Sequence, residues 1–470
     1  MHVYATLISR LGTFAMRPKH AGACAEAFEP VGRLARLIAV WDRDCSRRCV
    51  VAGGRSTPVA NPGISGVSII VLILLLLTCQ AAHGQDWPQF LGPGRNGVYA
   101  GQVPAEWPKP GIEVLWKVDV GQGFSAPVVA RGRVILFHRR EKQAIVESLE
   151  EATGKRIWSA AYPTDYRDDF GFDEGPRAAP AVAGDRIFTF GAEGVLQALD
   201  FSTGKRLWSV DTRQKFDAPK GFFGAACSPL VDDGRVLMNI GGPNGAGIVA
   251  FDAATGKVLW MATNDEAGYS APVVATIGGA RHALFWTRAG LVDIDPATGK
   301  IRFQFPRRSR SHASVNAAAP LVVGDLVFLS ASYGTGATLL QIDGVSVKQL
   351  WDSDDALSNH YASSVYHDGY VYGYHGRQEF GQSLRAIELK TGKVQWNFDH
   401  FGAGTVTLAG DKLLLMREGG ELVVALATPK EFRPISRAQL LPATVRSYPA
   451  LANGRLYVRN ERTLACFDLR

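Results

Sequence analysis

Short apolar runs alternate with turn residues along most of this chain. Val, Ile, Phe, Tyr and Trp recur in short stretches separated by Gly, Asp and Asn, and 51 of the 470 residues are Gly. Short strands at regular spacing between turn signals are typical of an all-β sandwich, barrel or propeller. Apolar residues make up 46% of the sequence, which is enough for a large buried core. The pattern therefore predicts an all-β protein.

One turn motif repeats with a fixed period. The triplet Thr-Gly-Lys occurs five times, beginning at Thr153, Thr203, Thr255, Thr298 and Thr391. An aromatic residue follows three positions after each Lys, at Trp158, Trp208, Trp260, Phe303 and Trp396, and a degenerate copy of the unit ends at Trp351. Consecutive aromatics are 50, 52, 43, 48 and 45 residues apart. A period of about 40 to 50 residues with several strands per unit predicts propeller blades.

The residue types of the repeat have a structural explanation. Asp caps the turn with its side chain, and Gly supplies the positive φ that closes it. The strand that follows sends a large flat ring between adjacent blades. We therefore assign a packing role to the repeat tryptophans Trp116, Trp158, Trp208, Trp260, Trp351 and Trp396.

A second motif marks the inner strand of each unit. It begins with Ser/Ala-x-Pro or a relative, continues with apolar residues and ends at a Gly/Asp/Asn turn. Eight copies start at Ser125, Arg177, Cys227, Ser270, Ala318, Ser363, Thr405 and Ser447. Each predicts an inner strand, a hairpin turn and a second strand.

The two ends of the repeat region complement each other. Residues 112–117 resemble an outer strand without its blade, and the segment around Cys466 resembles a blade without its outer strand. Pairing them closes the ring and protects the sheet edges. We predict an eight-bladed propeller over residues 112–470, preceded by an arm over residues 85–111, with seven blades as the alternative.

The segment before the arm reads as a targeting signal. An apolar run over residues 67–77 precedes Ala82-His83-Gly84, a small-x-small cleavage site. About eleven apolar residues are too few for a membrane span, which needs roughly 20. We predict a signal peptide at residues 61–84 and export to the periplasm or cell envelope. A membrane-anchoring helix and lipidation at Cys79 are the alternatives.

Residues 1–60 precede this signal, although a signal peptide is expected at the N-terminus of its precursor. We expect them to be disordered, or not part of the natural product, with translation starting downstream at a codon such as that of Val50 or Val51. They also carry nine of the chain's Lys and Arg residues against four acids, so the remainder is close to neutral. A nearly neutral body has no electrostatic footprint for nucleic acid.

Across residues 116–470 the repeats resemble the family of PQQ-like propellers. Residues 86–97 (DWPQFLGPGRNG) are also similar to the mature N-terminus of exported PQQ-like propellers of the planctomycete type. The superfamily includes quinoprotein dehydrogenases and non-catalytic scaffolds of the BamB type. Fold alone does not choose between them.

The resemblance also implies what a quinone site would require. Quinoprotein dehydrogenases use a disulfide between adjacent cysteines, an aromatic floor, basic residues for the quinone carboxylates, calcium ligands and a catalytic Asp. After the signal, this chain has only Cys227 and Cys466, 239 residues apart, which we expect to be buried free thiols. We therefore predict a non-catalytic module that binds a protein or small ligand, with no cofactor; a PQQ-dependent dehydrogenase with calcium is the alternative.

Two clusters of polar residues are not explained by the repeat motifs. The acidic segment 162–177 could hold Ca²⁺, but a solvated loop is the favoured interpretation. His312, Asn316, His360, Tyr361 and His375 could hold a metal, but a polar channel lining is favoured because their spacing is not that of metal ligands.

Loops that lead into the inner strands converge on one face of a propeller. Eight residues hold comparable positions there and are predicted to ring the channel mouth as a ligand site: Phe124, Arg177, Cys227, Tyr269, Asn316, His360, Tyr361 and Tyr448. Aromatic and cationic groups together suit a small anion, a sugar or a peptide.

Overall fold

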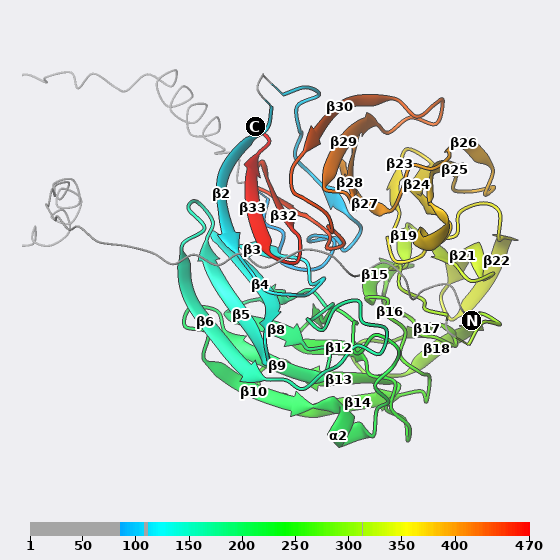
Figure 1. Ribbon diagram of the computed structural model, residues 1–470. Helices are drawn as coiled ribbons and strands as arrows, with labels where there is room; N and C mark the ends of the chain where they lie inside the picture. The colour runs from blue at the N-terminus through cyan, green and yellow to red at the C-terminus, as the bar shows by residue number, and fades with distance from the viewer. Residues whose placement is uncertain (1–84, 108–110, 313) are drawn as a thin grey trace, which may run out of the picture. The chain divides into compact units, whose positions relative to one another are not determined.

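The computed structural model describes residues 85–107, 111–312 and 314–470, which belong to one compact unit. In these residues the chain forms eight sheets arranged as a propeller, and this confirms the predicted fold and blade number (Figure 1). Among the described helices, none is long and apolar enough to cross a membrane. The predictions for residues 1–60, for the signal at residues 61–84 and for lipidation at Cys79 lie outside the described residues.

Each blade contains four antiparallel strands. Blades 1 and 2 consist of β3 (Val128–Ala130), β4 (Arg133–Arg140), β5 (Gln143–Glu150) and β6 (Arg156–Pro163), then β7 (Ala181–Ala183), β8 (Arg186–Phe190), β9 (Val195–Asp200) and β10 (Arg206–Asp211). Blades 3 and 4 consist of β11 (Leu230–Asp232), β12 (Arg235–Asn239), β13 (Ile248–Asp252) and β14 (Val258–Ala262), then β15 (Val273–Ile277), β16 (Ala280–Trp286), β17 (Gly290–Ile294) and β18 (Ile301–Pro306).

The second half of the ring repeats this order. Blades 5 and 6 consist of β19 (Leu321–Val323), β20 (Leu326–Ala331), β21 (Gly336–Asp343) and β22 (Ser346–Ser353), then β23 (Val365–His367), β24 (Tyr370–His375), β25 (Ser383–Glu388) and β26 (Val394–Phe398). Blade 7 consists of β27 (Gly404–Ala409), β28 (Lys412–Arg417), β29 (Glu421–Leu426) and β30 (Pro434–Gln439). Short helices α2 (Thr212–Phe216) and η1 (Gln378–Phe380) lie in connecting loops.

Blade 8 joins the two ends of the repeat region. Its strands β31 (Ala450–Ala452), β32 (Arg455–Arg459) and β33 (Thr463–Asp468) are completed by β2 (Glu113–Asp119), which pairs antiparallel with β33. The register runs from Glu113 opposite Asp468 to Asp119 opposite Thr463. This pairing confirms that an N-terminal outer strand closes the ring (Figure 1).

The repeat tryptophans link each blade to the next. The indole Nε1 of Trp158 in blade 1 donates a hydrogen bond of 3.1 Å to the carbonyl of Phe201 in blade 2. Its ring lies over Gly204, where an added Cβ would come within 2.5 Å of the ring. The same relationship joins Trp116 to Gly154, Trp208 to Gly256, Trp260 to Gly299 and Trp351 to Gly392, and Trp396 donates to the carbonyl of Thr428. The Gly of the triplet therefore serves both the turn and the neighbouring ring.

Two outer strands lack a tryptophan at this position, and each precedes a blade without the long turn. Phe303 in blade 4 precedes blade 5, whose outer hairpin turns tightly at Gly344 and Val345. Ser436 in blade 7 precedes blade 8, where β33 and β2 are not joined by a hairpin. The tryptophan and the turn that receives it thus occur together around the described ring.

The arm before β2 crosses the central channel. Trp87 forms a bridge with Val129 of β3 in blade 1, and β1 (Val98–Tyr99) pairs parallel with β27 of blade 7. Between these contacts, buried Arg95 donates to the carbonyls of Ser228, Pro229 and Pro272 on blades 3 and 4. Burial lowers the pKa of Arg95 to about 10, so its charge persists at neutral pH. The arm is therefore an integral part of the propeller interior.

Candidate functional site

A cavity of about 220 Å³ opens at the mouth, the end of the channel where the chain leads into the inner strands. Eight of its eighteen lining residues are Phe or Tyr, and the full lining is Phe90, Phe124, Phe172, Arg177, Phe223, Ala226, Ser228, Tyr269, Ala271, Val315, Ala317, Tyr333, His360, Tyr361, Gln378, Glu379, Arg446 and Tyr448. Phe90 from the arm packs edge-on against Tyr448 with ring centroids 5.1 Å apart. The arm thus contributes to the wall of the cavity, which we call the mouth cavity.

The repeat places one residue from seven blades in this wall. The third residue before the Pro position that leads into the inner strand lines the mouth cavity in every case: Phe124, Arg177, Ala226, Tyr269, Ala317, Tyr361 and Arg446. Successive residues of extended backbone point to opposite sides. A shared register therefore aims these side chains at the channel.

Six of the eight residues predicted to ring the mouth line this cavity: Phe124, Arg177, Tyr269, His360, Tyr361 and Tyr448. Cys227 and Asn316 do not, because each is one residue away from the wall positions Ala226 and Ala317. The buried Sγ of Cys227 lies 3.5 Å from the backbone N of Asn239, and Asn316 Nδ2 donates to the carbonyl of Thr287. Both cysteines after the signal are free and buried. A ligand role for the six lining residues stays a prediction.

Sequence reasoning missed several residues of the wall. Arg446 follows the repeat register and could have been found by aligning the residue before each inner-strand motif. Phe172, Phe223, Tyr333 and Glu379 come from loops that differ between blades, so no periodic signal marks them.

The carboxylates of the acidic segment 162–177 accept hydrogen bonds from backbone amides within the segment and from the neighbouring Gly123. The side chain of Asp168 accepts from the amides of Phe170 and Phe172 and pairs with Arg177 at 3.0 Å. Buried Asp173 accepts from the amides of Gly123 and Gly175. These carboxylates hold the loop that carries Phe172. No group of three or more His, Cys, Asp or Glu residues suited to a metal occurs among the described residues.

Arg446 belongs to a network that joins three blades. Oε1 of Glu418, in the loop between β28 and β29, accepts from Nε of Arg446 at 2.8 Å and from the hydroxyl of Tyr361 at 2.7 Å. The guanidinium carbon lies 5.5 Å from the ring centroid of Phe124 and 5.7 Å from that of Phe172. Burial and the Glu418 carboxylate raise the pKa of Tyr361 well above its usual value. Tyr361 therefore stays protonated and donates to Glu418.

His360 and Tyr333 form another polar part of the wall. His360 Nε2 lies 2.8 Å from the hydroxyl of Tyr333, and His360 Nδ1 has no hydrogen-bond partner among the described residues. Burial lowers the pKa of His360 to about 4, so the imidazole is neutral at pH 7. Glu379 beside it pairs with Arg377 at 2.8 Å, and this pairing contributes to its lowered pKa.

Exposed aromatic rings continue from the cavity onto the rim of the mouth. Phe170 and Phe172 in the acidic loop contact Phe223 in the loop before β11, with ring centroids 5.1 and 6.2 Å apart. Phe170 and Phe172 are each more than half exposed, and Phe222 also contacts Phe170. We call Phe170, Phe172, Phe222 and Phe223 the rim cluster. Exposed apolar patches of this kind mark interaction surfaces.

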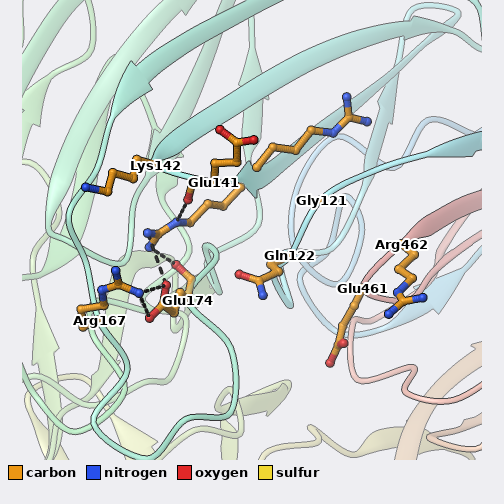
Figure 2. Close-up of a pocket in the computed structure, with 10 residues that line it drawn as sticks. Gly121, Gln122, Glu141, Lys142, Arg167, Glu174, Glu461 and Arg462 are labelled. Atoms are coloured by element: carbon orange, nitrogen blue, oxygen red, sulfur yellow. Dashed lines mark hydrogen bonds and ion pairs between the residues drawn. The ribbon is translucent and has the colours of Figure 1, made fainter. Parts of the chain in front are cut away.

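A second cleft of about 560 Å³ lies beside the mouth, between blades 8 and 1 (Figure 2). Its lining is charged and includes Arg139, Arg140, Lys142, Arg167, Arg462, Glu141, Glu174 and Glu461. Glu174 accepts two bonds from Arg167 and also pairs with Arg139. In Figure 2 the side chains of Lys142 and Arg462 lie on opposite sides of the cleft and do not converge. The mouth cavity is therefore the better candidate site.

Comparisons with known proteins agree on the type of propeller. The profile of the family described as outer membrane protein assembly factor BamB matches residues 142–397 and 380–470. A search of curated proteins gives no match.

Solved structures share the fold at low sequence identity. BamB from Moraxella catarrhalis is 17% identical with a TM-score of 0.57, covering 76% of this chain and 98% of that chain. Quinohemoprotein alcohol dehydrogenase from Comamonas testosteroni is 15% identical with a TM-score of 0.57, covering 83% and 82%. The computationally designed Ika8 protein is 12% identical with a TM-score of 0.52, covering 76% and 98%. At such identities the likeness concerns the fold alone.

Proposed function

This chain belongs to the family described as outer membrane protein assembly factor BamB, and from that membership we propose that it is a non-catalytic binding module of the cell envelope. Its ligand site is the mouth cavity together with the rim cluster. The ligand is a protein segment or a small molecule that presents apolar or aromatic groups.

The proposal rests on one observation: the charged side chains around the aromatic cavity are paired with one another. Three ion pairs surround the cavity: Arg177 with Asp168, Arg446 with Glu418, and Arg377 with Glu379. A general acid or base works best with a pKa near the operating pH. His360, with a pKa of about 4, and Tyr361, with its raised pKa, are both far from that range. The wall is suited to contact and orientation of a ligand, which supports a binding role.

The residues of the mouth cavity do not fit a calcium-bound quinone. Calcium takes six to eight oxygen ligands, usually from several carboxylates. Glu379 is the one carboxylate among the described lining residues, and it is already paired with Arg377. The volume of about 220 Å³ is also below the roughly 300–1,000 Å³ that is usual for cofactor sites. These features support binding over dehydrogenase chemistry.

Peptide selection tests the binding role. A random peptide phage library panned on the purified protein should yield sequences rich in aromatic residues. Binding of the selected peptides should weaken in Phe172→Ala and Phe223→Ala. The matched control is Phe398→Ala, which removes an exposed ring from outer strand β26 and should leave binding unchanged. Equal binding by all three variants would exclude the mouth as the site.

The enzymatic alternative has its own assay. Purified protein supplied with PQQ and Ca²⁺ should show neither bound quinone absorbance nor alcohol-dependent dye reduction. Saturable dye reduction that depends on PQQ would overturn the non-catalytic proposal.

The cell-envelope location is supported by family membership and by the predicted signal at residues 61–84. Fractionation of cells that express the full chain, followed by mass spectrometry of its N-terminus, tests this part. Recovery of uncleaved chain in the cytoplasmic fraction alone would contradict it.

A further inference from the structure

Arg446 has unused hydrogen-bonding capacity at the wall of the mouth cavity. Its Nε donates to Glu418, while Nη1 and Nη2 make no hydrogen bond to any described residue. Arg177, the other arginine of the wall, differs because its Nη groups donate to Gly175, Asp168 and Asp173. Arg177 therefore holds the loop, whereas Arg446 retains donors for a ligand.

The surroundings of Arg446 orient its donors. Glu418 fixes the Nε edge of the guanidinium, and the rings of Phe124 and Phe172 lie against the group without offering a hydrogen-bond acceptor. An arginine presents paired N–H groups in a planar fork that matches a carboxylate. The carboxylates nearby are occupied, since Glu418 also accepts from Tyr361 and Glu379 pairs with Arg377. The two free nitrogens are thus suited to an acceptor that comes from outside the protein.

The shape of the cavity limits what the acceptor can belong to. Arg95 of the arm occupies the channel between blades 3 and 4, and Phe90 and Tyr448 pack together at the cavity wall, so a chain cannot pass straight through. A volume of about 220 Å³ accommodates one ring and little more. Tyr269, Tyr333 and Phe223 provide ring faces and edges for it, and aromatic pairs of this kind add about 0.5–1.5 kcal/mol beyond burial.

Resting on the proposed binding function, we infer that the mouth cavity binds an aromatic ring that bears a carboxylate. The ring lies among Phe223, Tyr269 and Tyr333, and the carboxylate accepts from Nη1 and Nη2 of Arg446. Two sources share this chemistry: the C-terminal aromatic residue of a polypeptide, and a free aromatic carboxylic acid. Arg446 acts as the specificity-determining residue, because the aromatic wall by itself does not distinguish an acid from an amide.

The experiment compares ligands on the unmodified protein. Isothermal titration is performed with a short peptide ending in Phe, with the same peptide amidated at its C-terminus, with the same peptide ending in Ala, and with N-acetyl-phenylalanine. We expect the free acid to bind roughly ten-fold or more tightly than the amide, as for a charge-assisted hydrogen bond. The Phe peptide should likewise exceed the Ala peptide. This comparison needs no variant and so does not depend on the folding of one.

Variants then locate the recognition. Arg446→Gln should bring the acid and the amide to the same affinity, and Arg446→Lys should retain part of the difference. Arg462→Gln, at the second cleft, is the matched control and should leave the preference for the acid unchanged. Thermal melting of each variant checks its fold.

The outcomes separate the inference from the function it rests on. Equal affinity of acid and amide for the unmodified protein would overturn the inference while leaving a binding module intact. Failure of every aromatic ligand to bind would remove both. Equal affinities for the Phe peptide and N-acetyl-phenylalanine support the inference with a free acid as the source, and a tighter peptide supports it with a polypeptide end that also contacts the rim cluster.

Discussion

The ring of Trp158 lies over Gly204 of the next blade, so closely that a Cβ at position 204 would come within 2.5 Å of it. The contact accounts for the strongest signal in the sequence, the Thr-Gly-Lys triplet followed by an aromatic residue. The glycine is required twice, by its φ of +73° and by the neighbouring ring. The repeated motif therefore reflects the packing between neighbouring blades as well as the turn.

Gly204→Ala separates these two requirements when it is compared with Gly132→Ala. Both glycines have a φ of +73°, but an added Cβ at Gly132 meets nothing within 4 Å. The strain of a positive φ should cost about 1 kcal/mol in each variant. Overpacking against Trp158 should cost Gly204→Ala about 1–3 kcal/mol more. Urea unfolding followed by tryptophan fluorescence measures the difference; equal losses would refute the role of the ring.

The arm shows where the periodic signal ends. The blades could be predicted because most of them repeat the same turn, strand and ring, whereas residues 85–111 occur once and carry no period. The sequence predicted the arm only as a segment before the propeller. That it crosses the channel depends on long-range contacts such as Arg95 with Pro272, 177 residues apart, which no local pattern encodes.

Arg95→Met should destabilise the propeller strongly. The substitution keeps an apolar stem of similar length but leaves the carbonyls of Ser228, Pro229 and Pro272 without their donor in a buried site. Each unpaired buried group costs about 1–3 kcal/mol, so we expect a loss of about 3 kcal/mol or more. Arg131→Met is the control, because Arg131 forms an exposed ion pair with Asp185 and should change stability by less than about 0.5 kcal/mol. Similar melting temperatures for the two variants would show that the buried hydrogen bonds of Arg95 do not stabilise the propeller.

The acidic loop should lose its order when Asp168 is removed. The side chain of Asp168 accepts from the amides of Phe170 and Phe172 and pairs with Arg177. In Asp168→Ala we expect hydrogen exchange at these two amides to become about ten-fold or more faster, as loss of roughly 1.4 kcal/mol of local stability would give. Asp165→Ala, at an exposed carboxylate in the same loop, should leave both amides protected. Unchanged protection in Asp168→Ala would mean that the loop is held in another way.

The candidate site was predicted only as far as the repeat register was read correctly. Phe124, Arg177, Tyr269 and Tyr361 share one register position and line the same cavity, while their role as ligand contacts stays a prediction. Cys227 and Asn316 lie one residue away from that register position and do not line the cavity, because successive residues of extended backbone point to opposite sides. Phe172 and Glu379 lie in loops of irregular length, whose course depends on contacts such as Asp168 with Arg177.

Acid should destabilise the protein partly through His360. Burial lowers the pKa of its imidazole from 6.5 to about 4 in the fold. Between those values the unfolded chain binds a proton that the folded chain does not, so the free energy of unfolding falls as the pH falls from about 6.5 to about 4. Above about pH 6.5 the imidazole is neutral in both states, and stability no longer depends on its titration. His360→Gln keeps a partner for the hydroxyl of Tyr333 and removes the titrating group. The melting temperature of this variant should therefore decline less between pH 7 and pH 4.5 than that of the unmodified protein.

His375, whose pKa is also lowered to about 4 by burial, keeps part of the acid sensitivity in both proteins. His312→Gln, at an exposed histidine, should follow the unmodified curve. If the melting temperature of His360→Gln shows the same pH dependence as that of the unmodified protein, protonation of His360 does not contribute to the acid destabilisation.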